Sequence, residues 1–381
     1  MSKNNQVPEQ TSMHPKKKKK GSGLLGRIIR RFFLLLFTVI VLILAALILA
    51  ANLVFNGPST AAQEVLTMTL LEPSATKWVP ALFIGEERVA EIQNGKSIAM
   101  ADEETDINQV IIQKSTALTS STNEWANYPD GIRIEDRAGS TYNAHIMIVR
   151  NPAQVYTGIS TKNGFNTSTP GKRLTEAIEE EGAIAAVNAG AFNDDGTGGS
   201  YVGSVPEGLV YSEGKCVWST GAPPNGITGF AGFTKDDILV VSKDNMSKAR
   251  AEELGIRDGC CFGPALIING EINMEAYNSA SGLNPRTAIG QRADGAVIIV
   301  CIDGRQPGSM GGTYADVINI MVEYGAVNAC NMDGGSSSVM LYRDTTGRYG
   351  TAGEVRMMNS YSLLQSKPRR MPNYWLVRPA Q

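Results

Sequence analysis

The chain has 381 residues, with 35 Lys and Arg against 37 Asp and Glu, 43% hydrophobic residues and 40 glycines. This composition excludes a disordered, collagen-like or disulfide-dense chain. Two histidines, His14 and His145, are too few for a multi-histidine zinc site. Residues 1–31 carry nine Lys and Arg against one Glu, which leaves an acidic remainder. We therefore expect no nucleic-acid partner, because nucleic-acid binding depends on neutralising phosphates with basic side chains.

The first predicted element is an apolar transmembrane helix over residues 32–55. These 24 residues carry no charge and can span a bilayer, whereas the apolar region of a signal peptide is only about 7 to 15 residues long. Lys16 to Lys20 precede the segment, and the first charge after it is Glu64. By the positive-inside rule we expect a single-pass protein of the cell membrane, with residues 1–31 as a cytoplasmic tail and the C-terminal part extracellular. Cleavage as a signal peptide is the alternative.

Residues 56–130 are predicted to form a stalk and linker. The segment begins with a polar break, Asn56 to Ser59, and continues with an apolar stretch from Trp78 to Ile92 that is typical of a short helix. Residues 115–127 are dominated by Ser, Thr and Asn without a sustained apolar period, which indicates a linker. A separate domain is therefore predicted over residues 131–381.

The predicted domain is a dense series of short apolar runs typical of β-strands. The runs cover residues 144–149, 155–159, 184–188, 208–211, 238–241, 265–268, 296–302 and 327–332. Turns such as Asn269-Gly270 and Asp294-Gly295 join several of them as hairpins. Helices are predicted over residues 172–181 and 314–324, each followed by glycine. We expect an α+β fold with a mixed, mainly antiparallel sheet.

Four of the apolar segments carry polar residues and glycines at one end, at Asn188, Arg286, Asp303 and Asp333. A side chain at the end of a buried strand is held rigidly and can still face a cleft, and neighbouring glycines let a ligand approach the backbone. Each Asp-Gly pair taken alone is first of all a turn former. The four segments together are what indicates a site.

In this order the segments resemble the phosphodiester glycosidase family, over residues 144–374. The resemblance rests on the runs Asn188 to Phe192, Pro206 to Gly208, Phe262 to Pro264 with the following Leu-Ile-Ile-Asn-Gly hairpin, Arg286-Thr287, Asp303 to Arg305 and Asp333 to Gly335. Ser336 stands where the family's last motif often has a third glycine. The resemblance implies a glycosidase that hydrolyses a glycosyl phosphodiester, such as an N-acetylglucosamine-1-phospho-linked glycan, in cell-envelope or exopolysaccharide metabolism. With its apolar segment before the domain, the chain also resembles bacterial members of this family that carry a membrane anchor.

The chemistry of such a substrate suggests roles for these residues. A sugar 1-phosphodiester carries one negative charge and gains oxocarbenium character at the anomeric carbon as the bond breaks. Asp333 and Asp303 are expected to act as base, nucleophile or electrostatic stabiliser, and Arg286 to contribute to catalysis by binding the phosphate. The expected substrate-binding residues are Asn188, Arg305, Thr287, Gly334, Gly335, Ser336 and Ser337, with the N–H groups of residues 334–336 as an anion-binding nest.

Other features have plainer interpretations. His145, inside an apolar strand, is interpreted as a structural histidine, and the five cysteines as packed thiols or at most one disulfide. The loop from Asn193 to Gly198 is interpreted as a flap beside the pocket. Ser204 at its twelfth position excludes an EF-hand and leaves an irregular calcium site as the alternative. We expect no metal or other cofactor. A non-catalytic domain that binds cell-wall glycans or assembles polymers stays open as the second function.

Overall fold

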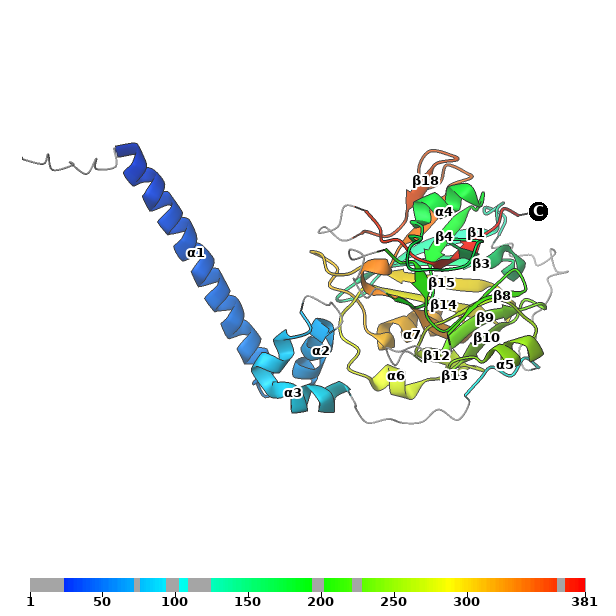
Figure 1. Ribbon diagram of the computed structural model, residues 1–381, viewed down its shortest axis with the longest axis horizontal. Coiled ribbons are helices and arrows are strands. Elements are labelled where there is room, and N and C mark those ends of the chain that lie inside the picture. Colours follow the sequence, from blue (N-terminus) through cyan, green and yellow to red (C-terminus); the bar gives the residue numbers. More distant parts are fainter. Residues whose placement is uncertain are drawn as a thin grey trace, which may run out of the picture. The chain divides into compact units, whose positions relative to one another are not determined.

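A computed structural model describes residues 24–71, 76–93, 103–108, 125–193, 202–220, 228–361 and 367–380 (Figure 1). The chain divides into two compact units, residues 1–54 and residues 55–381. Most of the basic tail, much of the predicted linker and the loop over residues 194–201 lie outside the described residues.

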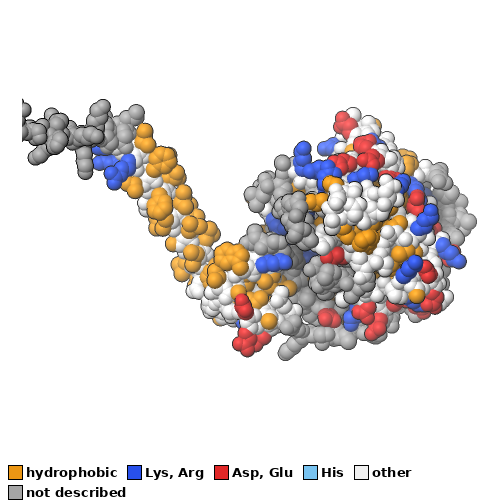
Figure 2. All heavy atoms as spheres, in the orientation of Figure 1, with side chains coloured by type: hydrophobic (Ala, Val, Ile, Leu, Met, Phe, Trp, Pro, Cys, Tyr) orange, Lys and Arg blue, Asp and Glu red, His pale blue; other side chains and the backbone are white. Residues whose placement is uncertain are grey.

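The first unit consists of helix α1, Leu24–Phe55. Its section Arg27–Phe55 has a mean hydropathy of 3.3 and is long and apolar enough to cross a membrane. Hydrophobic side chains cover the helix and are exposed along it (Figure 2). The helix begins before the predicted residue 32, because the preceding residues include Leu and Arg, which are good helix formers.

The strands of the second unit form three larger sheets and one two-stranded ribbon among the described residues. The seven-stranded sheet has the order β1 (Ile132–Ala138), β2 (Asn143–Val149), β15 (Val297–Ile302), β14 (Arg286–Arg292), β16 (Ala326–Met332), β12 (Ala265–Ile268) and β13 (Glu271–Ile272). One five-stranded sheet has the order β10 (Leu239–Ser242), β9 (Phe230–Thr234), β11 (Ile256–Cys261), β7 (Leu209–Ser212) and β8 (Lys215–Ser219). The other has the order β18 (Val355–Met357), β17 (Met340–Arg343), β4 (Ala185–Asn188), β19 (Asn373–Val377) and β3 (Val155–Ile159). The ribbon pairs β5 (Phe192–Asn193) with β6 (Val205–Pro206).

The helices of this unit are short. Their bounds are α2 Thr60–Leu71, α3 Val79–Gln93, α4 Leu174–Glu180, α5 Lys248–Glu253, α6 Met274–Asn278 and α7 Tyr314–Glu323, with 3-10 turns η1 Pro152–Gln154 and η2 Gly335–Ser337. Helices α2 and α3 precede β1, and the others lie between strands in sequence. Gly85 (φ 78°) breaks the helical geometry inside α3. The helices predicted over residues 172–181 and 314–324 correspond to α4 and α7.

All three larger sheets share one hydrophobic core. Met147, Phe233 and Trp375, from one sheet each, belong to the same buried cluster. The opposite face of each sheet packs on a helix: the seven-stranded sheet on α7, the sheet of β17 on α4, and the sheet of β9 on α5 (Figure 1). The predicted α+β class with antiparallel pairing is confirmed. The sequence predicted one sheet, whereas the structure has three larger ones. Each of them uses one face for the common core and the other face for a helix.

Helix α7 shows how local sequence fixes the elements around the seven-stranded sheet. Thr313 and Asp316 form a capping box at its N-terminus, and its buried residues include Val317, Ile318 and Met321. Gly325, with φ 81°, follows its C-terminus, where a left-handed residue ends a helix without a Cβ penalty. The helix is therefore held on the outer face of β14 and β15, with Tyr314 at the end where β14 begins.

The predicted stalk contacts the predicted domain at several described places. One is Asp130, whose carboxylate accepts from Tyr342 Oη and Thr345 Oγ1. Two others are Thr69 and residues 103–108. The N–H of Leu283 donates to Thr69 Oγ1 of α2 at 2.8 Å. Residues 103–108 lie against β10, where Thr105 is 3% exposed. The N–H of Val241 donates to Thr105 Oγ1 at 2.9 Å, and Asn328 Oδ1 of β16 lies 3.1 Å from the same hydroxyl. The domain boundary at residue 131 therefore stays a prediction, to be tested by shortening the chain.

We predict that Thr105→Val lowers the free energy of unfolding by about 1–3 kcal/mol, because it leaves the buried N–H of Val241 without its acceptor. A protein that begins at residue 131 should unfold at a lower temperature than one that begins at residue 56, for the same reason. Denaturant and thermal unfolding measure both effects.

Thr351→Val is the matched control, because Thr351 is exposed and the same change should leave stability within about 0.5 kcal/mol. Equal stability of the two shortened proteins would show that residues 56–130 are a stalk that adds nothing to the core.

Candidate functional site

Three neighbouring strands of the seven-stranded sheet bring predicted residues to one edge. β14 lies between β15 and β16, and its first residues are opposite the last residues of both. β15 and β16 are both antiparallel to β14, so they end at the same edge of the sheet. Asp303 follows β15, Asp333 follows β16, and Arg286 begins β14 between them. Two strand spacings of about 4.8 Å place the two aspartates roughly 10 Å apart.

Asn188 joins a second sheet to this edge. It ends β4, and its side chain is fully buried. Its amide nitrogen donates to the main-chain carbonyl of Asp333. Its oxygen accepts hydrogen bonds from Thr287 Oγ1 at 2.9 Å and from the N–H of Val339 at 3.1 Å. Asn188 and Thr287, expected from the sequence to bind substrate, are thus bonded within the protein and hold the backbone of Asp333 in place.

Arg286 lies beneath the site rather than at its surface. Its side chain is 3% exposed, and its guanidinium donates to the carbonyls of Gly312 at 3.1 Å, Gly282 at 3.2 Å and Ser281. The guanidinium carbon lies 4.4 Å from the centre of the Tyr314 ring. The sequence predicted a cation that faces a phosphate, whereas the structure has a buried cation that fixes the loop before β14 and the start of α7. Its predicted contact with a phosphate stays a prediction.

Asp303 is also buried, at 2% exposure, and both of its carboxylate oxygens have partners. The N–H of Ser360 donates to Oδ1 at 2.8 Å, and His145 Nε2 lies 3.3 Å from Oδ2. His145 Nδ1 lies 2.8 Å from Asp136 Oδ1 on β1. Burial disfavours the imidazolium, but hydrogen bonds and charge from Asp303 and then Asp136 outweigh it, so the pKa of His145 is raised.

The loop from Asp333 to Ser338 is the most accessible part of this edge. Asp333, Gly334, Gly335 and Ser336 are half-buried, while Ser337 is fully buried. The N–H of Gly335 donates to the carbonyl of Pro285 at 2.9 Å. This N–H, one member of the predicted nest over residues 334–336, therefore already has an acceptor within the protein, and the nest stays a prediction.

Two other arginines lie against this loop. A Cβ at Gly335 would lie 3.3 Å from both terminal nitrogens of Arg305, so the guanidinium covers the glycine closely. Arg305 also donates to Asn284 Oδ1 at 3.0 Å and is half-buried. Arg369 donates to Ser336 Oγ at 3.3 Å, and its guanidinium carbon lies 5.0 Å from the centre of the Phe192 ring. Arg305 was expected to bind substrate, and its half-buried position beside Asp333's loop is compatible with that.

Three members of this region, His145, Tyr361 and Arg369, were not predicted from the sequence to belong to a site. Tyr361 Oη donates to the carbonyl of Ser336 at 2.8 Å. Strand alternation alone places His145 on a sheet face without showing which carboxylates it meets, and residues 361 and 369 come from loops after β18 whose position depends on the tertiary fold. A hydrophobic pattern holds no signal for such contacts.

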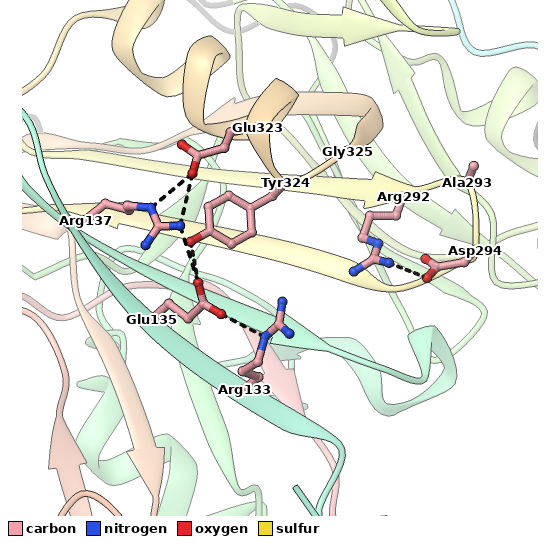
Figure 3. A pocket seen from close by; sticks show the side chains of 9 residues that line it. All are labelled: Arg133, Glu135, Arg137, Arg292, Ala293, Asp294, Glu323, Tyr324 and Gly325. Carbon is pink, nitrogen blue, oxygen red and sulfur yellow. Dashed lines mark hydrogen bonds and ion pairs between the residues drawn. The ribbon is translucent and has the colours of Figure 1, made fainter. Parts of the chain in front are cut away.

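A pocket of about 590 Å³ lies elsewhere, along β1, the end of α7 and the β14–β15 turn (Figure 3). Arg133 and Arg137 pair with Glu135 at 3.1 and 3.7 Å, and Arg292 pairs with Asp294 at 2.7 Å. Its charges therefore balance one another, and none of the predicted site residues lines it. Among the described residues no group of three or more His, Cys, Asp or Glu is placed to hold a metal ion. The predicted flap lies outside the described residues from 194 onward.

Comparisons with known proteins support a family. The model of the phosphodiester glycosidase family matches residues 181–378, which is just over half of the chain. The catalytic domain of zebrafish N-acetylglucosamine-1-phosphodiester alpha-N-acetylglucosaminidase, auto-inhibited by its pro-peptide, has a similar fold, with a TM-score of 0.51 and 21% identity over 67% of this chain and 85% of that one. At this identity the likeness shows the fold alone.

A curated relative is an uncharacterized SPbeta prophage-derived protein of Bacillus subtilis strain 168, YomE, which is 27% identical over 182 residues. The match covers 47% of this chain and 27% of that relative. The chain therefore spans about a quarter of the relative's length.

We predict that Asn188→Ala lowers the free energy of unfolding by at least about 2 kcal/mol, because it leaves buried partners on Thr287, Val339 and Asp333 unsatisfied. Denaturant unfolding measures the loss. Thr287→Val is the matched control, since it removes only one of these three bonds and should cost less. A cost of Asn188→Ala no larger than that of Thr287→Val would contradict the assigned role of the amide.

Proposed function

Because the chain belongs to the phosphodiester glycosidase family, we propose that it hydrolyses a glycosyl phosphodiester at the edge where β14, β15 and β16 meet. The observation that carries the proposal is the half-buried Asp333, on a loop that Arg305 and Arg369 both contact. A carboxylate and guanidinium groups side by side match the two charges of this reaction, a cationic sugar and an anionic phosphate.

In this proposal Asp333 faces the anomeric carbon. A carboxylate there stabilises the oxocarbenium character that develops as the glycosidic bond breaks, whether as a nucleophile, a base or a fixed charge. Its backbone is held by Asn188 and by the N–H bond to the Ala189 carbonyl at 3.0 Å. The carboxylate therefore needs little reorganisation to act, which is how electrostatic stabilisation becomes effective.

We place the phosphate on Arg305, the more exposed of the two arginines predicted to bind it. Its planar fork suits two phosphate oxygens, and it lies directly over Gly335 in the loop after Asp333. Arg286 and Asp303 then act from beneath as positioning residues, because each is at most 3% exposed and is bonded to the protein. The sugar, the aglycone and the cell-envelope or exopolysaccharide role belong to this proposal as the substrate class expected from the family resemblance.

We predict that Asp333→Asn lowers kcat/KM for a methyl diester of N-acetylglucosamine 1-phosphate by about a hundredfold or more, the scale of one electrostatic group in the transition state. Arg305→Lys should also be poor, because a point charge does not replace a bidentate fork. A methyl glycoside without phosphate should not be a substrate, since its alkoxide leaving group needs a proton donor. Mass spectrometry of the products measures each rate.

Asp294→Asn in the pocket of Figure 3 is the matched control, an aspartate substitution outside the site that should leave turnover unchanged. Normal turnover by folded Asp333→Asn protein would exclude the mechanism. Binding of the diester without turnover by the unsubstituted chain would favour the non-catalytic alternative.

We also propose that α1 anchors the chain in the cell membrane with the C-terminal unit outside the cytoplasm, because α1 is long and apolar enough to cross a membrane and the basic residues precede it. Protease added to intact cells should remove the residues after Phe55 and spare an N-terminal tag. Protection of the C-terminal unit would contradict this orientation, and loss of the tag with release of the unit would indicate a cleaved signal peptide.

A further inference from the structure

A line of contacts runs from the surface of the seven-stranded sheet to the loop after Asp333. Asp136 on β1 is opposite His145 on β2, and His145 is opposite Cys301 on β15. The imidazole lies between two carboxylates of very different exposure, 79% for the side chain of Asp136 and 2% for that of Asp303. His145 thus connects an aspartate in water to one in the interior.

We propose that His145 is a positioning residue of the hydrolytic site: its ring pairs with the buried carboxylate of Asp303, and Asp303 in turn holds residues 359–361 against the loop that carries Asp333. This inference rests on the proposed function for its meaning in catalysis, while its structural part stands on the contacts alone.

The buried carboxylate of Asp303 requires such a partner. Burying an ionised carboxylate costs several kcal/mol unless it is paired and hydrogen-bonded. The N–H of Ser360 satisfies one oxygen, at 2.8 Å, and His145 is the basic side chain described at the other, at 3.3 Å. With a neutral ring this carboxylate would have no cationic partner among its described contacts, so the protonated ring is the state that the geometry favours.

Residues 359–361 pass the effect of Asp303 to the site. The N–H of Met340 donates to Asn359 Oδ1 at 2.8 Å, and Asn359 Nδ2 donates to the carbonyl of Ser338 at 3.1 Å. Tyr361 Oη donates to the carbonyl of Ser336 at 2.8 Å. Residues 359–361 therefore hydrogen-bond to both ends of the stretch 336–338. This stretch follows Asp333, Gly334 and Gly335 in the same loop. Loss of the bond between Ser360 and Asp303 would loosen these contacts without touching a substrate-binding group.

The direction in which pH changes the contact between His145 and Asp303 follows from the groups around the ring. The groups facing the ring are Asp136 from β1, Asp303 from the end of β15 and the thiol of Cys301, whose pKa is raised by burial so that it is neutral at neutral pH. Burial lowers the pKa of His145, and the two aspartates raise it to a net value above the usual one of about 6.5. The stabilising contact is therefore complete below about pH 6.5 and is lost as the pH rises through the raised pKa of the folded state.

We expect kcat/KM for the diester to fall as the pH rises through the pKa of His145, mainly through kcat because His145 and Asp303 act on the position of the Asp333 loop and do not themselves contact the substrate in this proposal. His145→Gln keeps a hydrogen-bond donor but no charge, so its activity should be up to about a hundredfold lower at mildly acidic pH and should lack this alkaline fall. A merely structural histidine would lower the amount of folded protein and leave the shape of the pH profile unchanged.

A second measurement needs no activity. The full chain, labelled with 15N-histidine and held in detergent micelles, has only His14 and His145 to observe, and His14→Gln assigns them. The ring of His145 should titrate above 6.5, and both Asp136→Asn and Asp303→Asn should lower that pKa, with the larger effect for the buried Asp303. Titration of His145 at or below 6.5, or a value unchanged by Asp303→Asn, would overturn the proposal even if His145→Gln fails to fold.

The two experiments separate the inference from the function it rests on. If the diester is not hydrolysed but the imidazole titrates as expected, the proposed function fails, while the pairing of His145 with Asp303 and its hold on residues 359–361 stand. If the diester is hydrolysed and His145→Gln keeps the pH profile of the unsubstituted chain, the positioning role fails alone.

Discussion

The buried amide of Asn188 is the contact on which the arrangement of the site depends. It ends a strand of one sheet and bonds to residues that begin or follow strands of another, so two sheets with a common core meet at one side chain. A shift of either sheet by one residue would move the amide away and would also turn its neighbours to the other face. The backbone of Asp333 is therefore as rigid as the packing of the whole core.

Burial sorts the charged residues that gather at this edge into two kinds. Arg286 and Asp303 are at most 3% exposed and form hydrogen bonds to other groups of the protein. Arg305 and Asp333 are half-buried. A charge kept in the interior must be paired or bonded to avoid a large desolvation penalty, so the described contacts of Arg286 and Asp303 support the fold. Residues of the same type at the same edge, Arg286 and Arg305 or Asp303 and Asp333, thereby differ in how much of each side chain water can reach.

Much of the fold could be predicted from the sequence, because strands such as β15 and β16 are continuous apolar runs that end in glycine and polar residues. β1 was missed because its outward residues alternate as Arg133, Glu135 and Arg137, which masks its inward apolar residues. The grouping of Asp303 with Asp333 followed from their similar strand ends, and the register bears out that they share an edge. The burial of Arg286 and the partners of His145 could not be predicted, since both depend on which loops cover that edge.

The charge of Asp303 has a further consequence for any anion that binds near Asp333. Two unit charges roughly 10 Å apart interact by about 1.7 kcal/mol at an effective dielectric constant of 20, which is more than a tenfold change in affinity. If a bound phosphate lies as far from Asp303 as Asp333 does, an unpaired Asp303 carboxylate would oppose its binding by about that much. In the proposed state a protonated His145 offsets the charge of Asp303, and the second carboxylate on the ring, Asp136, is 79% exposed and screened by water, so that the attraction of Arg305 for the phosphate is not cancelled. A buried aspartate can then brace the loop after β18 without opposing the binding of an anionic substrate.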